Sequence, residues 1–315
     1  MSRADGPSSP LSGIGRTPLV RLARLGAPGS ADVLVKLEGG NPTGSYKDRM
    51  ASSMIEGAER RGALRPGQRV VEFSGGSTGS SLAFVCAVKG YPCTIVSSDA
   101  FSDEKLRTMR ALGADVVVVP SDGGFITPAL FERMRVVLDD IVERDGAHWT
   151  DQFHNVDALL GYDAMGSEIV EQTRMLDSPV RVFCAAVGTG GMLAGVARTL
   201  RPAIPGLRVV ALEPETSPML TAGRAGPHRV EGIATGIVPP LLVGGVQDEA
   251  LTVDEGRARG NAAELARREG IFAGTSTALN VTAALDLAAA LGSGHTVITV
   301  ACDSGLKYLA GDLFA

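Results

Sequence analysis

Short apolar runs alternate with longer amphipathic segments along almost the whole chain. The apolar runs are rich in β-branched residues and hardly alternate with polar ones, which is typical of strands buried on both faces of a sheet. We expect strands at 33–37, 69–73, 93–97, 115–119, 181–187, 207–212 and 296–301. The segments between them have helical spacing, and we expect helices at 46–62, 78–89, 103–112, 127–143, 157–174, 190–200, 254–268 and 276–291.

This alternation predicts an α/β fold with mostly parallel sheets wrapped by helices. The chain has 315 residues, enough for about two domains of roughly 150 residues each. We find no Pro-, Gly- or Ser-rich linker long enough to separate two continuous domains. If there are two domains, we therefore expect the chain to cross between them.

Charge and composition argue against several classes of partner. The chain has 30 Lys and Arg residues against 35 Asp and Glu residues, a net charge of −5. A mildly acidic chain is repelled by nucleic acid and by an anionic membrane surface, so neither is expected as its main partner. No apolar run approaches the ~20 residues of a membrane span, and the N-terminus lacks the apolar core of a signal peptide. We therefore expect a cytoplasmic protein without a nucleic-acid or membrane partner.

The cysteines and histidines give no sign of a metal site. There are four of each, and none shows the spacing typical of metal ligands. We expect the cysteines to be small buried residues in a reducing compartment, and we expect no bound metal.

Two glycine-rich junctions join an expected strand to an expected helix. They cover residues 72–80 (EFSGGSTGS) and 187–192 (VGTGGM). At such a junction the backbone N–H groups and the helix dipole point to one place, so each is a candidate anion site. The alternative is an ordinary tight turn. Neither junction has the Lys of a P-loop or the spacing of a dinucleotide fingerprint, which argues against nucleotide binding.

A third motif places a lysine at the start of an expected helix. Residues 41–49 read NPTGSYKDR, and we expect Gly44 and Ser45 to act as turn and N-cap. Lys47 then lies in the first helical turn, where the helix dipole disfavours a cation and so favours a neutral amine. A neutral lysine amine is what a Schiff base requires. The alternative is a solvated surface lysine, which the surrounding motif makes the weaker interpretation.

Together the motifs resemble a known family. From residue 15 onward the chain is similar to the fold-type II pyridoxal-phosphate enzymes of the cysteine synthase / cystathionine β-synthase family. Residues 15–20 (GRTPLV) resemble G-N-T-P-L-V, and residues 41–49 resemble N-P-x-G-S-x-K-D-R. Residues 74–79 resemble T-S-G-N-T-G, residues 188–191 match G-T-G-G, and residues 269–277 contain counterparts of E-G-I and G-I-S-S. All five occur in the family's order, which makes the resemblance specific.

The resemblance implies a two-domain, tryptophan synthase β-like fold, pyridoxal 5′-phosphate as cofactor, and a homodimer. It implies that residues 1–40 and 155–315 form a larger cofactor-binding domain. Residues 41–154 would form a smaller, mobile domain that carries the loop for the substrate. The expected partners are a small amino-acid substrate and a nucleophile.

Residue roles follow from the same resemblance. Lys47 would hold the cofactor and act as the catalytic base. Ser276 would bond the pyridine nitrogen, with Thr277 as the neighbour that could replace it. Ser77 would lie near the 3′-oxygen of the cofactor. The cofactor phosphate would be bound by Gly188, Thr189, Gly190 and Gly191. The substrate carboxylate would be bound by Ser74, Gly75, Gly76, Thr78 and Gln152.

Several positions depart from the family pattern. Ser77 stands where the family has Asn, Gly75 where it has Ser, and Met192 where it has Thr. Other departures lie at 160–168, around Tyr162, and at 232–236 and 303–305. We expect cofactor binding to survive. We also expect Ser77 and Gly75 to leave extra room beside the substrate, and the accepted substituent or nucleophile to shift, toward bulkier ones.

The expected reaction is β-replacement on a β-substituted L-alanine of the O-acetylserine or O-phosphoserine type. It would proceed through α-aminoacrylate, with sulfide as the nucleophile, to give L-cysteine or an analogue. One alternative is α,β-elimination of the serine/threonine dehydratase or cysteine desulfhydrase kind, which releases pyruvate and ammonia. Another is a non-catalytic paralogue that binds a partner.

Overall fold

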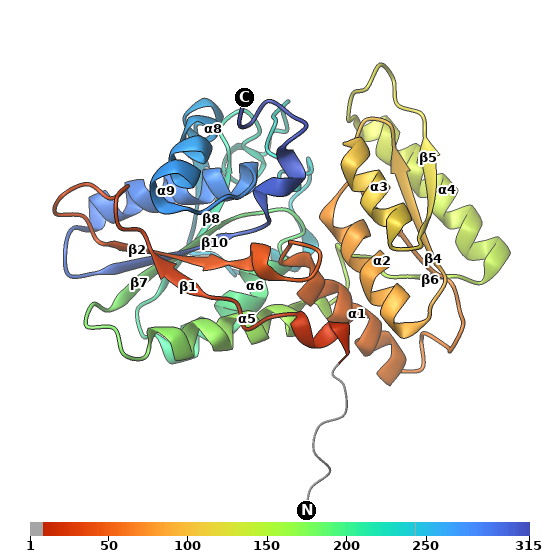
Figure 1. Cartoon of the computed structure of the whole chain (residues 1–315), viewed down its shortest axis with the longest axis horizontal. Coiled ribbons are helices and arrows are strands. Elements are labelled where there is room, and N and C mark those ends of the chain that lie inside the picture. The colour runs from red at the N-terminus through yellow and green to blue at the C-terminus, as the bar shows by residue number, and fades with distance from the viewer. Residues whose placement is uncertain (1–8, 243) are drawn as a thin grey trace, which may run out of the picture. The chain divides into compact units, whose positions relative to one another are not determined.

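The computed structural model describes residues 9–242 and 244–315 (Figure 1). The chain folds as two compact units. The smaller unit contains Asn41–Asp157 together with the described residues up to Arg16, and the larger contains Thr17–Gly40 and Ala158–Ala315. The chain therefore passes from one unit to the other three times. The roles that we expect of the two parts stay predictions.

The smaller unit is built on a parallel four-stranded sheet in the order β5-β4-β3-β6. Its strands are β3 (Val70–Phe73), β4 (Cys93–Ser98), β5 (Asp115–Val119) and β6 (His148–Trp149). Its helices are α1 (Lys47–Arg60), α2 (Ser77–Lys89), α3 (Asp103–Ala111) and α4 (Pro128–Asp145). The apolar residues of α4 recur every three or four positions, so they share one face of the helix. This face packs against the sheet. The resulting core is Val71, Val96, Val119, Leu130, Met134, Leu138, Ile141 and Ala147.

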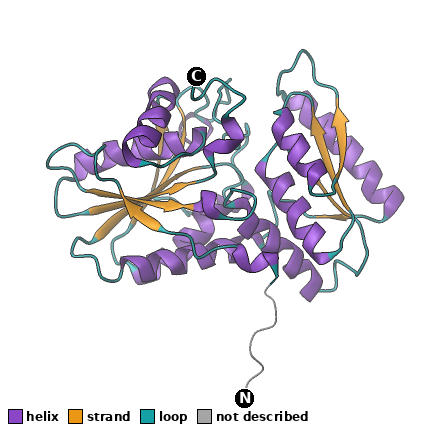
Figure 2. Cartoon of the chain, viewed as in Figure 1, coloured by secondary structure: helices purple, strands orange, loops and turns teal. Residues whose placement is uncertain are grey.

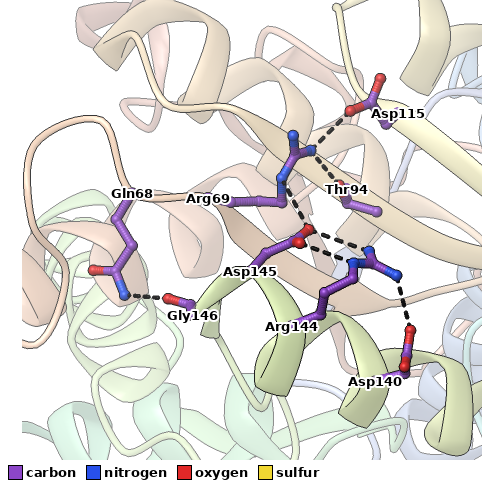
Figure 3. Close-up of polar contacts among 8 residues, drawn as sticks. All are labelled: Gln68, Arg69, Thr94, Asp115, Asp140, Arg144, Asp145 and Gly146. Carbon is purple, nitrogen blue, oxygen red and sulfur yellow. Dashed lines mark hydrogen bonds and ion pairs between the residues drawn. The ribbon is translucent and has the colours of Figure 1, made fainter.

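Ion pairs tie together the amino-terminal edge of this sheet (Figure 3). The Arg69 guanidinium donates to Thr94 Oγ1 at 2.7 Å and to Asp115 Oδ2 at 2.8 Å, and lies 3.7 Å from Asp145 Oδ2. Arg144 also binds Asp145, at the end of α4. These contacts join β3, β4, β5 and α4. Polar residues at this edge thus serve the fold, which directs attention to the opposite, carboxyl edge.

The larger unit has a six-stranded sheet in the order β1-β2-β10-β7-β8-β9, in which only β1 runs antiparallel to its neighbour. Its strands are β1 (Leu19–Arg21), β2 (Asp32–Leu37), β7 (Val180–Ala186), β8 (Arg208–Pro214), β9 (Glu249–Val253) and β10 (Thr296–Ala301). Its helices are α5 (Ala158–Thr173), α6 (Gly191–Ala203), α7 (Met219–Ala222), α8 (Glu255–Glu264) and α9 (Thr275–Leu291). Helices cover both faces of the sheet (Figure 2).

A buried lysine joins the sheet of the larger unit to α5. Lys36 is the next-to-last residue of β2 and is fully buried. Its Nζ donates to Thr17 O at 2.7 Å, to Glu168 Oε2 at 2.6 Å and to Gln172 Oε1 at 2.9 Å. Three acceptors compensate the loss of water around the ammonium group. This explains why an otherwise apolar strand contains a lysine.

The α/β fold with mostly parallel sheets is confirmed, and each expected strand and helix is present with small shifts at its ends. We did not predict β1, β6, β9 or α7. The first two strands are too short to show a period, and β9 is a half-buried edge strand. The four cysteines are buried, as predicted.

Candidate active site

Lys47 lies at the start of α1, in the smaller unit. Gly44 has a φ of 73° and its N–H donates to Asn41 O at 2.7 Å, which makes the expected turn. The helix begins at Lys47 with Tyr46 as its N-cap, so the expectation that Ser45 is the N-cap is wrong, although the Lys47 N–H donates to Ser45 Oγ at 3.3 Å. The Lys47 side chain is only 6% exposed, and its Nζ lies 5.0 Å from the centre of the Tyr46 ring. Lys47 is therefore not a solvated surface lysine.

The segment around Lys47 is held by Asp48. The carboxylate of Asp48 accepts the Thr43 N–H at 2.7 Å and the Thr43 hydroxyl at 2.5 Å. Thr43 Oγ1 also lies 3.3 Å from Ser81 Oγ on α2. The lysine segment is thereby tied to the helix that follows the loop expected to bind the substrate.

We call residues 74–79 the substrate loop: residues 74–76 connect β3 to α2, and residues 77–79 begin α2. Ser74 Oγ accepts the N–H groups of Gly76 at 3.2 Å and Gly79 at 3.1 Å. Thr78 Oγ1 donates to Gln152 Oε1 at 2.7 Å, and Gln152 Nε2 donates to Phe73 O at 3.0 Å. The structure thus brings Ser74, Thr78 and Gln152 together at one end of β3. Ser77 is the first residue of α2.

Glu72, which we did not single out in the sequence, organises this end of the sheet. It is fully buried, and its carboxylate accepts Thr150 Oγ1 at 2.7 Å, the Gln152 N–H at 3.0 Å and Trp149 Nε1 at 3.2 Å. Burial raises the pKa of Glu72 to about 7, although these hydrogen bonds favour the ionised form. An acidic residue inside an apolar strand, just before a glycine loop, was the available signal.

Our expectation that Gly75 leaves extra room is wrong. A Cβ at Gly75 would lie 2.2 Å from Cδ1 and Cε1 of Phe101. The Phe101 ring therefore occupies the space that a side chain at position 75 would take. We missed this because Phe101 lies 26 positions further along the chain.

In the larger unit, residues 188–191 form a turn at the start of α6, which we call the phosphate cup. A Cβ at Gly188 would lie 2.4 Å from Gly232 O, and one at Gly190 would lie 2.8 Å from Leu242 Cγ. Gly190 also has a φ of 81° and is the N-cap of α6. Glycine is thus required at both positions. The first-turn N–H groups of a helix have no partner within the helix, which suits an anion.

Tyr162 is a neighbour of the phosphate cup. Its Cε2 lies 3.5 Å from the Cβ position of Gly191, and its Cβ lies 2.6 Å from that of Gly195. The residue is fully buried. Tyr162 therefore packs against the first turns of α6 from α5.

Ser276 and Thr277 lie at the start of α9, in the larger unit. Both are buried. Thr277 Oγ1 accepts the Cys302 N–H at 2.9 Å, so that hydroxyl is used to anchor the segment after β10. Ser276 is thus the better candidate for bonding a cofactor.

Residues 232–236, which replace the family's G-I-G-A-G, lie beside the cup. The Ala234 N–H donates to Val187 O at 3.0 Å, and His228 Nε2 lies 3.1 Å from Ala234 O. Ala234 has a φ of 47°, a left-handed conformation that usually favours glycine. The adjacent Thr235 Oγ1 is buried and has no hydrogen-bond partner within the described ranges. This hydroxyl is open to a further hydrogen bond, and sequence reasoning had assigned it no role.

The described part of the chain has neither a metal-binding cluster nor a membrane-spanning helix. No cluster of three or more His, Cys, Asp or Glu side chains is arranged to hold a metal ion. No helix within 9–242 or 244–315 has the length and apolar character needed to cross a membrane.

Comparison with known proteins decides the family. The model of the family described as "Pyridoxal-phosphate dependent enzyme" matches residues 11–303. The chain belongs to this family. A cysteine synthase of Staphylococcus aureus is 37% identical over 303 residues, 96% of this chain and 95% of that protein. The O-ureido-L-serine synthase of Streptomyces lavendulae is 38% identical over 314 residues, 98% of this chain and 92% of that protein.

A solved structure of a similar enzyme supports the same family. The hydrogen sulfide-producing enzyme of Fusobacterium nucleatum superposes with a TM-score of 0.87 at 34% identity, covering 96% of this chain and 100% of that one. The resemblance drawn from the motifs is confirmed. The protein is a pyridoxal-phosphate dependent enzyme of the cysteine synthase type. In the larger unit, the crowded glycines of the cup suit a phosphate group. In the smaller unit, the buried Lys47 suits an aldehyde.

Proposed function

We propose that this protein catalyses β-replacement on an O-substituted L-serine, exchanging the oxygen substituent for a nucleophile such as sulfide. The observation that carries the proposal is that the smaller unit contains both a buried Lys47 and a substrate loop that is held by hydrogen bonds through Gln152. Relatives named cysteine synthase and O-ureido-L-serine synthase support it.

Bound pyridoxal phosphate supplies an electron sink for negative charge at Cα of the amino acid. We assign to Lys47 Nζ the attachment of the cofactor and then the removal of the Cα proton. The N–H groups of the substrate loop hold the carboxylate, which fixes the position of Cα. The Thr78 hydroxyl donates its single proton to Gln152 Oε1, and it reaches the carboxylate by exchanging that acceptor for it. Gln152 positions Thr78 through their 2.7 Å hydrogen bond.

The remaining assignments lie in the larger unit. The phosphate cup holds the cofactor phosphate with backbone N–H groups and the Thr189 hydroxyl. Ser276 offers a neutral hydroxyl to the ring nitrogen. This gives a weaker electron sink than a carboxylate partner, which suits the rapid departure of a β-substituent. We further propose that residues 155–315 with 1–40 bind the cofactor, that 41–154 move on substrate binding, and that the enzyme is a cytoplasmic homodimer.

The first experiment tests the lysine. Purified holoenzyme is reduced with borohydride, and the labelled peptide is identified by mass spectrometry. We expect the label on Lys47, and Lys47→Ala is expected to lose turnover by several orders of magnitude. A label on Lys36, Lys89, Lys105 or Lys307 contradicts the assignment.

The second experiment tests the reaction. O-acetyl-L-serine and O-phospho-L-serine are each incubated with holoenzyme, with and without sulfide, and the products are identified by mass spectrometry. We expect an amino-acid product that requires the nucleophile. Pyruvate formed at the same rate without any nucleophile supports elimination instead.

A further inference from the structure

The Phe101 ring lies directly against the substrate loop. A Cβ at Gly75 would lie 2.2 Å from Cδ1 and Cε1 of Phe101 and 2.5 Å from Cγ, closer than real Cβ contacts. Position 75 must therefore be glycine while the ring keeps this place. The two positions are coupled although they are far apart in the sequence. The family's serine hydroxyl at this point of the loop is replaced by an aromatic ring.

The fold holds the ring in this position. Phe101 lies in the turn between β4 and α3. Its N–H donates to Ser98 O at 3.2 Å, and the Ala100 N–H donates to Ser98 Oγ at 3.2 Å. Asp99 Oδ1 accepts the Ser121 N–H at 2.7 Å, which ties the turn to the segment after β5. The ring is therefore placed by a hydrogen-bonded turn, and it also packs against the core under α4.

Two further rings flank the same loop. Phe73 precedes the loop directly and stacks on Phe153, with ring centres 6.3 Å apart and planes 18° apart. Phe153 follows Gln152, which bonds the Phe73 carbonyl. All three phenylalanines are half-buried. The chain has only nine phenylalanines, so three at one loop are a marked concentration of apolar surface.

We propose that Phe101 is a specificity-determining residue for the group exchanged at Cβ. The inference rests on the proposed β-replacement. The ring makes the side of the substrate loop apolar and flat, which favours planar nucleophiles that can stack on it, such as ureas, azoles and aromatic thiols. It offers no hydrogen bond to the strongly hydrated hydrosulfide anion, which must lose water to approach.

The exchange balances without any further reactant. The Cβ–O bond of O-acetyl-L-serine breaks, and acetate leaves with the electron pair. The O–H, N–H or S–H group of the nucleophile loses its proton and forms the new bond to Cβ. The products are the substituted alanine, acetate and one proton.

The test compares nucleophiles in the holoenzyme of five chains: wild type, Phe101→Ala, Gly75→Ser, the double variant, and Gly26→Ser as control. The control position has open space around its Cβ. The readout is kcat/KM for hydroxyurea, 1,2,4-triazole and thiophenol, each divided by kcat/KM for sulfide. We expect Phe101→Ala to lower these ratios about tenfold, the effect of losing one aromatic contact.

Gly75→Ser alone is expected to lose most activity with every nucleophile, because its Cβ meets the ring. The double variant should regain turnover, and Gly26→Ser should match the wild type. The inference is overturned if Phe101→Ala leaves the nucleophile ratios unchanged, or if Gly75→Ser is as active as Gly26→Ser. In either case the proposed function still holds, provided that the wild type forms cysteine. A wild type that releases pyruvate and forms no adduct overturns both.

Discussion

Of the three hydroxyl groups at the start of α9, two hold backbone segments in place and the third is the one that we assign to the cofactor. Thr275 Oγ1 accepts the Glu231 N–H at 3.0 Å, and Thr277 Oγ1 accepts the Cys302 N–H at 2.9 Å. Each of these hydroxyls fixes a segment that is distant in the sequence. Ser276 lies between them, about 100° away around the helix from each. Its hydroxyl therefore points to a third direction and is the one that we assign to the cofactor nitrogen.

Exchanging these hydroxyls should separate the two tasks. Ser276→Ala is expected to lower kcat about tenfold and to change cofactor affinity less, because the phosphate cup supplies most of the anchoring. Thr277→Val leaves the buried Cys302 N–H without its acceptor, and should lower the free energy of unfolding by about 1–3 kcal/mol. Kinetics and cofactor absorbance are measured for both variants. An inactive Thr277→Val of normal stability, beside a fully active Ser276→Ala, moves the role to Thr277.

The pKa of Glu72 makes a pH-dependent prediction. Burial raises it from 4.5 to about 7 in the folded protein. Between these values the folded chain holds a proton that the unfolded chain has lost. The free energy of unfolding of the wild type should therefore fall as pH rises through this window, relative to that of Glu72→Gln, by up to about 3 kcal/mol.

The only tryptophan in the chain, Trp149, offers a direct readout, since its Nε1 donates to Glu72 at 3.2 Å. Its emission should titrate with a midpoint near pH 7 in the wild type and lose this transition in Glu72→Gln. Urea unfolding of both chains at several pH values gives the stability difference. Identical emission titrations in the two chains would show that Glu72 does not ionise in this range.

At the scale of elements, buried strands were predictable and their polar exceptions were not. An apolar run such as 93–98 gives a clear strand signal, because both faces of β4 are buried. The burial of Lys36 depends on acceptors from α5, which the sequence separates from it by more than 130 positions. The Gly75–Phe101 contact is long-range in the same way. The glycine junctions were found because their pattern is local, whereas Glu72 and Thr235 acquire meaning only from their surroundings.

The Lys36 and Glu168 charges should be coupled, so that removing one costs more stability than removing both. Lys36→Met leaves the Glu168 carboxylate without its 2.6 Å ion pair, and should lower the free energy of unfolding by about 3 kcal/mol. Lys36→Met combined with Glu168→Leu removes both charges and should recover most of the loss. Urea unfolding midpoints of the two variants and the wild type decide this. A double variant less stable than Lys36→Met contradicts it.

At the scale of the whole molecule, strands from the early and the late part of the chain pair in one sheet. Strand β2, near the N-terminus, pairs in parallel with β10, near the C-terminus, over the full length of both (Figure 1). The larger unit therefore cannot complete its sheet until the last strand has formed, which makes its folding depend on distant contacts. The phosphate cup belongs to the same unit and needs residues 232 and 242 in place around it. Cofactor binding should therefore report on the integrity of the folded chain.

A change in the phosphate cup should therefore alter how far the cofactor stabilises the folded chain. Pyridoxal phosphate that binds only the folded chain stabilises it by about 4 kcal/mol at a thousandfold excess over Kd. Gly188→Ala places a Cβ 2.4 Å from Gly232 O, and should lose most of that gain while keeping Lys47. Gly260→Ala, in α8 with open space around its Cβ, should keep the full gain and start about 1 kcal/mol more stable. Urea unfolding of the three chains, with cofactor and after its removal by hydroxylamine, gives the comparison; an equal gain in Gly188→Ala would place the phosphate elsewhere.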